Sequence, residues 1–100
     1  MKTTNEYISL LQQHASELQS RFGISSMCLF GSVARGEQRE DSDVDLFVDM
    51  PPKAYNICAA AEYLEELLGC SVDLIRNHSN LRPFFLKQIQ HDGIQIFRAA

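Results

Sequence analysis

Apolar residues recur at alternating spacings of three and four along the first 22 positions, a period typical of an amphipathic helix. Thr3 or Thr4 can cap the start of this helix, Glu6 lies near the capping-box position, and Gly23 follows its end. The residues that share its apolar face are Ile8, Leu11, Ala15, Leu18 and Phe22. We predict one continuous helix that turns this face toward the core.

Four short β-prone runs follow, separated by helical segments and turns. They span residues 24–30, 44–48, 72–75 and 94–97, and the last is expected at the edge of a sheet. Residues 32–36 favour a short helical turn, and residues 37–41 form a polar loop.

Two further helices are predicted between and after these runs. One spans residues 53–68, and its apolar face carries Ile57, Ala61, Leu64 and Leu68. The other begins at Asn80, the expected cap, and has Pro83 in its first turn. Its inward positions are expected to be Leu81, Phe85, Leu86 and Ile89.

The alternation of helices and strands predicts an α+β sandwich, in which a small mixed β-sheet has helices packed on one face. Residues 1–100 are expected to form a single domain, because no linker or repeat interrupts the pattern. On the second strand, Val44, Leu46 and Val48 form an apolar side that should receive the helices. The opposite side, which includes Phe47, should be open.

The net charge of −4 argues against stand-alone nucleic-acid binding, which usually requires a basic surface. An acidic surface does suit a site that collects divalent cations. Three cysteines without a C-x-x-C pair are typical of a reducing compartment. Since no apolar run approaches the ~18 residues that span a bilayer, we expect a cytoplasmic protein that does not enter the membrane.

Two aspartates stand at the start of the second β-prone run. Alternate residues of a strand point to the same side, so Asp43 and Asp45 share one face. Neighbouring carboxylates repel each other, and a bound cation relieves that repulsion. Oxygen ligands on a rigid strand suit Mg²⁺, whose coordination is completed by water and substrate phosphates. Asp43 and Asp45 are therefore candidate metal ligands.

A third aspartate is expected beside them. A helix joins the second run to the third, and such a crossover favours parallel strands that start at the same end of the sheet. Asp73 occupies that start, between Val72 and Leu74. A carboxylate in an apolar strand is unfavourable unless it is paired or bound to a metal. The three aspartates fit a two-metal site, and the alternative is a solvated acidic strand end.

Gly31 and Ser32 end the first β-prone run, and a compact connection favours an antiparallel pair that brings them next to the aspartates. Glycine permits close approach of the backbone, and the amides and hydroxyl at a helix start suit phosphates. The alternative is an ordinary capped turn. Arg35 and Arg39 could reach a triphosphate or form surface ion pairs.

The chain thus carries Gly31-Ser32, ten further residues, Asp43-x-Asp45 and a later strand aspartate, Asp73. With this pattern it resembles the nucleotidyltransferase superfamily related to DNA polymerase beta. At 100 residues it most resembles the minimal nucleotidyltransferases. The resemblance covers nearly the whole chain in element order, and its specific residues cluster at 31–48 and at Asp73.

The resemblance implies metal-dependent transfer of a nucleoside monophosphate, expected to be AMP from ATP, to an acceptor hydroxyl. Asp43 and Asp45 would bridge two Mg²⁺ ions, with Mn²⁺ as the alternative. Asp73 would help to hold the catalytic metal and to deprotonate the acceptor. Gly31 and Ser32 would bind the β- and γ-phosphates, and pyrophosphate would leave. Arg35 is a further candidate for nucleotide binding.

The resemblance also implies a partner, because such small proteins often neutralise a helical HEPN toxin, some by adenylylating a tyrosine. A domain of this size has no room for its own substrate-binding domain, so a partner or a second copy is expected to complete the site. One alternative is an antitoxin that acts by occlusion without catalysis. Another is a small-molecule nucleotidyltransferase similar to aminoglycoside-modifying enzymes. The sequence identifies neither the base nor the acceptor.

Overall fold

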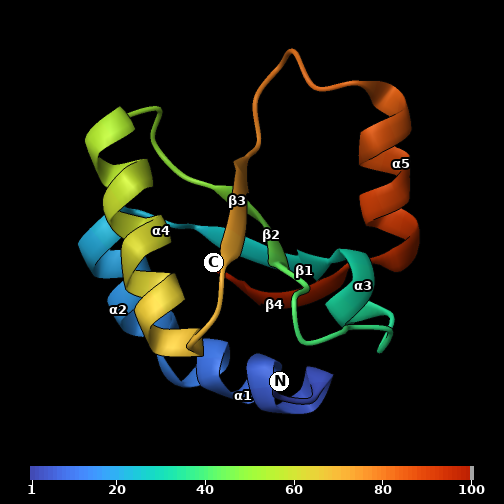
Figure 1. Ribbon diagram of the computed structural model, residues 1–100. Helices are drawn as coiled ribbons and strands as arrows, with labels where there is room; N and C mark the ends of the chain where they lie inside the picture. The colour runs from blue at the N-terminus through green and yellow to red at the C-terminus, as the bar shows by residue number, and fades with distance from the viewer. Residues whose placement is uncertain (100) are drawn as a thin grey trace.

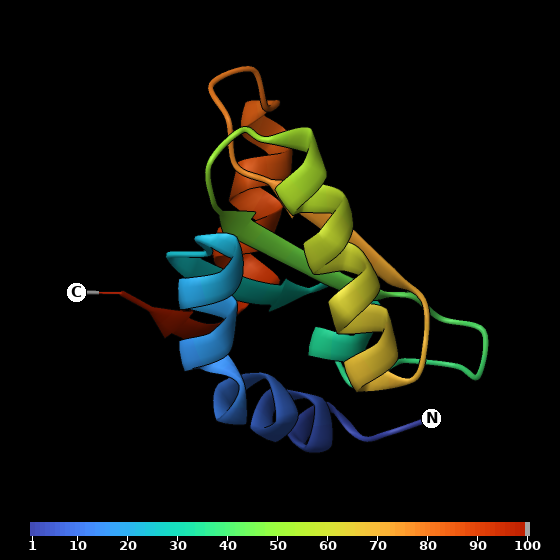
Figure 2. The same ribbon diagram turned by 90° about the vertical axis from the view of Figure 1, so that its left-hand side faces the viewer.

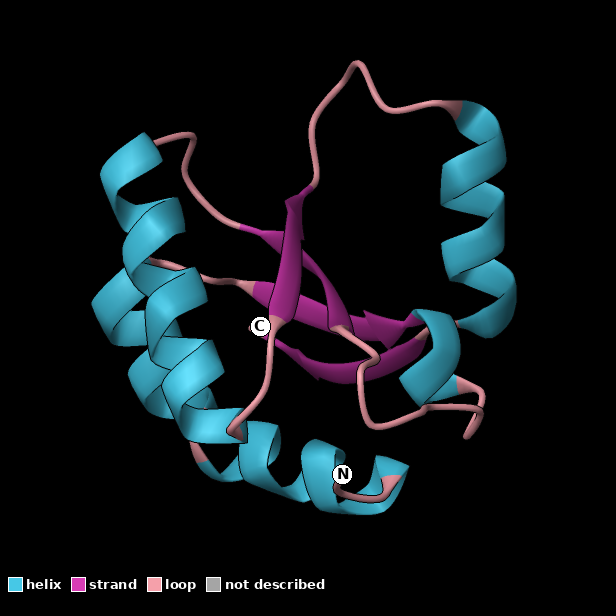
Figure 3. Ribbon diagram, in the orientation of Figure 1, coloured by secondary structure: helices cyan, strands magenta, loops and turns pink. Residues whose placement is uncertain are grey.

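Four strands form one mixed β-sheet in the order β3-β2-β1-β4, in a computed structural model that describes residues 1–99. The strands are β1 (Ser26–Phe30), β2 (Val44–Asp49), β3 (Val72–Arg76) and β4 (Ile94–Arg98). β1 pairs antiparallel with both β2 and β4, whereas β2 and β3 are parallel (Figure 1, Figure 3). The four predicted strands are therefore confirmed. So are the antiparallel pairing of β1 with β2, the parallel pairing of β2 with β3 and the position of β4 at the edge of the sheet.

Three helices cover one face of this sheet: α1 (Thr4–Gln13), α2 (Ala15–Phe22) and α4 (Ala54–Leu68). α3 (Gly31–Ala34) is a short helix that directly follows β1. The last helix, α5 (Pro83–Asp92), stands apart from α1, α2 and α4, on the opposite side of the sheet (Figure 1, Figure 2). The α+β class and the mixed sheet are confirmed, but the expectation that the helices pack on one face is wrong for α5.

The position of α5 follows from aromatic packing. Phe85 lies edge-on to Phe30 of β1, at 5.6 Å between ring centroids, and to Phe47 of β2, at 6.0 Å. Such edge-to-face pairs add to the favourable burial of the rings. The side of β2 that was predicted to be open is therefore partly covered. Hydrophobic periodicity identifies the apolar side of a helix, but it does not identify the sheet face that receives it.

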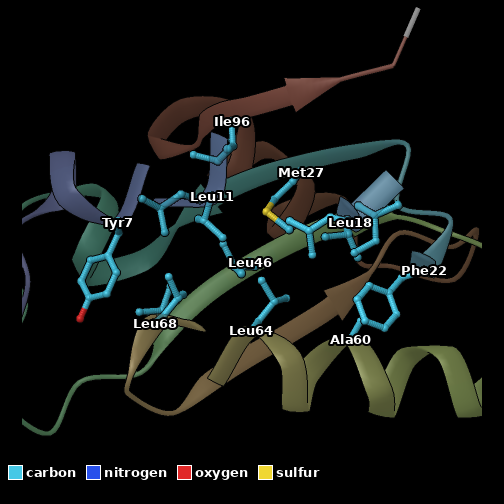
Figure 4. Packing of buried hydrophobic residues seen from close by; sticks show 14 of the residues in the cluster. Tyr7, Leu11, Leu18, Phe22, Met27, Leu46, Ala60, Leu64, Leu68 and Ile96 are labelled. Carbon is cyan, nitrogen blue, oxygen red and sulfur yellow. The ribbon is translucent and has the colours of Figure 1, made fainter. Parts of the chain in front are cut away.

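The main core lies between the sheet and α1, α2 and α4 (Figure 4). Val44, Leu46 and Val48 of β2 are fully buried there, as predicted. Figure 4 shows Leu46 and Met27 of the sheet packed among the helix residues Leu11, Leu18 and Leu64. On α4 the fully buried alanine is Ala60, whereas Ala61 is half-buried, so the apolar face is rotated slightly from the predicted one.

The predicted N-terminal helix is two helices, because the chain bends at His14. The ring Nδ1 of His14 lies 2.9 Å from the Leu10 carbonyl, the group that the His14 amide would bind in an unbroken helix. That amide donates instead to the Leu11 carbonyl at 3.3 Å.

The start of the helix agrees with the prediction, since Thr3 forms a capping box with Glu6.

The expected cap of the last helix is also corrected. α5 begins at Pro83 with Arg82 as its N-cap, and no side chain caps it. Proline forces the preceding residue into extended backbone, so the helix starts two residues later than Asn80 could cap. Ile89 is buried, and the other predicted inward residues of this region are half-buried: Leu81, Phe85 and Leu86.

Across residues 1–99, none of the helices combines the length and the apolar character needed to cross a bilayer.

Candidate active site

The parallel pairing of β2 and β3 aligns two of the three predicted aspartates. Asp45 and Asp73 are direct Cα partners in the register, so their side chains leave the same face of the sheet. Asp43 lies just before β2 and is exposed, as is Asp73, whereas Asp45 is half-buried. The structure thus brings Asp43, Asp45 and Asp73 to the end of the sheet where β2 and β3 start, and we refer to them as the aspartate cluster.

The turn at Gly31 packs directly on this cluster. Phe30, the last residue of β1, is the Cα partner of Asp45. Gly31 follows with a φ of +73°, and a Cβ added there would lie 3.0 Å from Cγ of Asp45 and closer still to its Oδ2. A side chain at position 31 would therefore collide with the carboxylate. The predicted neighbourhood of the glycine-serine turn and the aspartates is confirmed.

Burial and hydrogen bonds to residues outside the site hold α3 in place. Val33 is fully buried, and its carbonyl accepts a hydrogen bond from the hydroxyl of Thr4 on α1. The Ser32 carbonyl accepts a hydrogen bond of 2.9 Å from the Glu37 amide, and the Ser32 residue itself is half-buried. The turn that carries Gly31 and Ser32 is thus fixed on both sides.

The charges around Asp45 are unbalanced. Partial burial raises the pKa of the Asp45 carboxyl, and the negative charges of Asp73 and Asp43 raise it further. Arg35 is the cation that opposes them, and it lowers the pKa of Asp45. Three carboxylates against one guanidinium form a site at which further positive charge is favourable.

Whether a divalent cation fits depends on donor type and on placement. The donors are carboxylate oxygens on β2 and β3 and just before β2, which is the chemistry that Mg²⁺ prefers. However, no three His, Cys, Asp or Glu side chains within residues 1–99 already converge as a ready metal-ligand set. The aspartate cluster therefore suits a cation in charge and donor type, although its carboxylates are not closed around one point.

Arg35 lies at the same end of the sheet but has partners of its own. Its Nε is 3.2 Å from Oε2 of Glu37, and its Nη1 is 3.9 Å from Oδ2 of Asp92 at the end of α5. Together with Gly31, Arg35 lines a cavity of about 170 Å³ between α3 and α5. The side chain of Arg35 is 43% exposed, so a phosphate can reach it. Arg35 thus forms surface ion pairs and is at the same time accessible to a phosphate.

The loop before Asp43 is closed by a tight turn. The Arg39 amide donates to Oγ of Ser42 at 2.8 Å, and the Ser42 amide donates to the Arg39 carbonyl at 3.0 Å.

At the far end of β2, Asp49 accepts hydrogen bonds from Oγ of Ser26 at 2.7 Å and from Nδ2 of Asn77 at 2.9 Å. Asp49 therefore ties strand ends together and does not belong to the aspartate cluster.

The contribution of α5 was missed by sequence reasoning. Its first residues, together with Ile75 of β3 and the preceding loop, line a groove of about 490 Å³, and none of the three aspartates lines this groove. The available signal was the Phe84-Phe85 pair, in which Phe85 packs on the sheet while Phe84 stays 71% exposed. Another depression, of about 510 Å³, lies between α2 and α4, and none of the predicted site residues lines it.

Comparison with known proteins decides the family. The family profile described as nucleotidyltransferase domain matches residues 11–96, which is most of the chain. The chain belongs to this family. The resemblance read from the glycine-serine turn and the aspartates is therefore confirmed, and so is nucleotidyl transfer as the activity.

Individual relatives of this nucleotidyltransferase agree. It is 46% identical over 98 residues to the protein adenylyltransferase MntA of Thermococcus cleftensis, a match that covers 96% of this chain and 98% of that one. A solved structure of a candidate minimal nucleotidyltransferase aligns with a TM-score of 0.76 and 33% identity over 93% of this chain and 95% of the other.

A more distant structure shares the fold. It is a complex of a tri-AMPylated Shewanella oneidensis HEPN toxin with an MNT antitoxin, and it aligns with a TM-score of 0.65. The identity is 19%, over 92% of this chain and 73% of the other, so this likeness concerns the fold alone.

Proposed function

We propose that this nucleotidyltransferase moves AMP from ATP to a hydroxyl of a protein partner, a helical toxin of the HEPN type, and neutralises it. The assignment to a protein acceptor is supported by the 46% identical relative, which is named as a protein adenylyltransferase. The identity of the partner is supported by the fold shared with the antitoxin complex. The observation that carries the chemistry is the register of Asp45 with Asp73, with Gly31 packed on Asp45.

Each residue of the site has a proposed role. Gly31 and Ser32 bind the β- and γ-phosphates through the backbone of their turn and the serine hydroxyl. Arg35 leaves Glu37 and Asp92 to pair with the triphosphate, because a guanidinium binds phosphate well. Asp43, Asp45 and Asp73 would hold Mg²⁺, or Mn²⁺ in its place. The bound ion would neutralise phosphate charge and favour the in-line displacement at the α-phosphorus.

The order of the strands gives the reaction a direction. Gly31 follows β1 and Asp73 belongs to β3, and β2 with Asp45 lies between them. Because the attacking and leaving oxygens stand on opposite sides of the α-phosphorus, pyrophosphate departs toward β1 and the acceptor approaches from β3. Asp73 is exposed on that side, where it takes the proton of the attacking hydroxyl.

The test is mass spectrometry of a purified helical partner after incubation with this protein, ATP and Mg²⁺. We expect the partner to gain the mass of one or more AMP groups. The double variant Asp43→Asn with Asp45→Asn should abolish the gain, whereas Asp41→Asn, in the exposed loop outside the cluster, should leave it unchanged.

Two results would contradict the proposal. Tight binding of the partner without a mass gain, with any nucleotide, would favour an antitoxin that acts by occlusion. An unchanged gain in the double variant would remove the aspartates from the reaction.

A further inference from the structure

An apolar groove lies between β3 and the first turns of α5, and we call it the β3–α5 groove. Its volume is about 490 Å³, and its lining includes Ile75, Leu81, Phe84 and Phe85. Figure 1 shows α5 standing beside the sheet, with the loop from β3 leading to its start. Of the six phenylalanines, all within the described residues, Phe84 alone is exposed. Exposed aromatic rings are enriched where a protein surface meets a partner.

The segment that forms this groove is basic, although the chain as a whole is acidic. The residues between Asp73 and Asp92 include three of the nine Lys and Arg residues and none of the other eleven Asp and Glu residues. These three cations are Arg76, Arg82 and Lys87. Since the net charge of the chain is −4, this segment is opposite in sign to the rest of the molecule. Such a local field selects partners of negative charge.

Two of these cations stand close to Phe84. Arg82 lines the groove, and Lys87 is three residues after Phe84, so it shares the exposed side of α5. Both are exposed, and neither forms a salt bridge within residues 1–99. Arg21 and Arg35, by contrast, each pair with a carboxylate of their own chain. An exposed ring between two cations without acidic partners favours a ligand surface that is both apolar and acidic.

These features fit a protein better than a nucleic acid. Aromatic residues and arginine are enriched at the centres of protein interfaces, where a few side chains supply most of the affinity. A nucleic acid usually requires a broad basic surface, which a chain of net charge −4 does not provide.

The groove lies on the side from which the acceptor is proposed to approach. Ile75 follows Asp73 by two residues on the same face of β3, about 6.6 Å along the strand. A protein that presents a hydroxyl to Asp73 therefore extends over the neighbouring groove. Phe85 and Gln88 separate the groove from the cavity beside Gly31, so an occupant of the groove leaves that cavity free.

We propose that the acceptor protein docks in the β3–α5 groove through an acidic segment that carries an apolar anchor. The apolar side chain of the partner packs on Phe84, and its carboxylates pair with Arg82 and Lys87. This inference rests on the proposed function for the position of the acceptor at Asp73. It adds the surface that holds the acceptor protein and the chemistry that this surface selects.

The first experiment removes the aromatic anchor. Isothermal titration calorimetry gives the Kd of the purified helical partner for the wild type and for Phe84→Ala. We expect Phe84→Ala to raise this Kd about tenfold and to leave the Kd of ATP unchanged, because the groove is separate from the cavity beside Gly31. Tyr55→Ala is the matched control, because Tyr55 is an 84% exposed aromatic on α4, on the other side of the sheet.

The second experiment reverses the charges beside the anchor. Arg82→Glu with Lys87→Glu should raise the Kd of the partner about tenfold at low salt, and the difference should shrink at high salt as the charges are screened. Lys53→Glu with Arg98→Glu is the control, because it changes the net charge equally at two exposed cations outside the groove. Equal losses in the two double variants would overturn the pairing of an acidic segment with the groove.

Other occupants of the groove would be recognised in the same variants, and each would overturn the assignment. If Phe84→Ala weakens ATP instead of the partner, the groove holds the nucleotide. If a short RNA binds the wild type but not the variant Arg82→Glu with Lys87→Glu, the groove holds nucleic acid. If the wild type self-associates in analytical ultracentrifugation and Phe84→Ala does not, the groove holds a second copy of the chain.

The inference and the proposed function fail in different ways. An unchanged Kd of the partner in Phe84→Ala, with AMP transfer by the wild type intact, would overturn the docking site alone. A raised Kd in Phe84→Ala, without AMP transfer by the wild type, would overturn the proposed transfer and leave the docking site as that of an occluding antitoxin. A wild type that neither binds nor modifies the partner overturns both. The exposure of Phe84 makes misfolding of the variant a minor concern, and its thermal melting curve checks this.

Discussion

Gly31 adopts a φ of +73°, and the space where its side chain would stand is filled by the carboxylate of Asp45. The residue thus serves two purposes, because it allows a left-handed turn and lets the backbone that we propose to bind phosphate approach Asp45, the proposed metal ligand. Both purposes follow from the absence of a Cβ. Gly36 has a nearly equal φ of +71° but nothing within 4 Å of the position of a Cβ.

Substitutions at Gly31 and Gly36 distinguish the effect of backbone strain on stability from the effect of the Asp45 contact on the transfer rate. Gly31→Ala and Gly36→Ala should each lose about 1–2 kcal/mol of stability, since both place a Cβ at positive φ. Only Gly31→Ala should also displace Asp45, and we expect its rate of nucleotidyl transfer to fall about 100-fold. Urea unfolding and initial rates measure the two effects. Equal rates for the two variants would mean that the contact with Asp45 has no part in the activity.

Residue types and spacing alone were enough to find the aspartate cluster and the glycine-serine turn. Asp43 and Asp45 alternate on one strand, and Asp73 follows from the parallel crossover, so local pattern and topology together predict where they meet. The partners of Arg35 could not be predicted. Asp92 is 57 positions away in the sequence and reaches Arg35 only because α5 folds over this face.

At the scale of elements, α5 is the part that the sequence left undetermined. Its apolar positions predict a helix, but the same positions fit either face of the sheet. Phe30 and Phe47 alternate with the buried core residues of their strands, so they point away from the main core and need a cover. A pair of aromatic residues on the open face is therefore the signal for a helix on that side.

Two adjacent phenylalanines test the docking of α5. Phe85→Ala removes both edge-on contacts and should lower the free energy of unfolding by about 2 kcal/mol. Phe84→Ala removes an exposed ring and should change it by less than about 0.5 kcal/mol. Urea denaturation compares the two. Equal losses would contradict the packing of α5 through Phe85.

The break at His14 and the late start of α5 have similar causes. In both places a local interaction competes with the regular helix, namely a ring nitrogen on the Leu10 carbonyl and the restricted backbone before Pro83. Hydrophobic periodicity indicates which side chains are buried, but it does not indicate local interactions that break or delay a helix. The helical segments were therefore predicted well, and their ends less well.

For the molecule as a whole, the aspartate cluster that we propose for catalysis lowers the free energy of unfolding at neutral pH. The folded chain raises the pKa of Asp45 through burial and through Asp73 and Asp43, so folding takes up a proton there. Stability contributed by this group is present below the unfolded pKa and is lost as the pH rises through the folded pKa. Without a cation, the ionised carboxylate of Asp45 thus opposes folding at neutral pH.

Asp45→Asn should therefore stabilise the chain at neutral pH while it removes the activity. Because Asp45 is only partly buried, solvent screening limits the gain to less than about 1 kcal/mol. The gain should shrink as the pH falls below the folded pKa, where wild-type Asp45 is protonated. Urea denaturation in EDTA at a series of pH values measures this gain in the free energy of unfolding, and Asp41→Asn is the control. A variant less stable than the wild type at neutral pH would show that the carboxylate forms favourable contacts instead.

The location of β3 at the rim of the sheet has a consequence for what the enzyme accepts. Within residues 1–99, no strand pairs with the outer edge of β3, so under the proposed direction of attack the sheet sets no upper bound on the size of a molecule that presents a hydroxyl from that side. Selection among acceptors then depends on how a whole surface docks along this rim, and one small scaffold can serve partners of very different size.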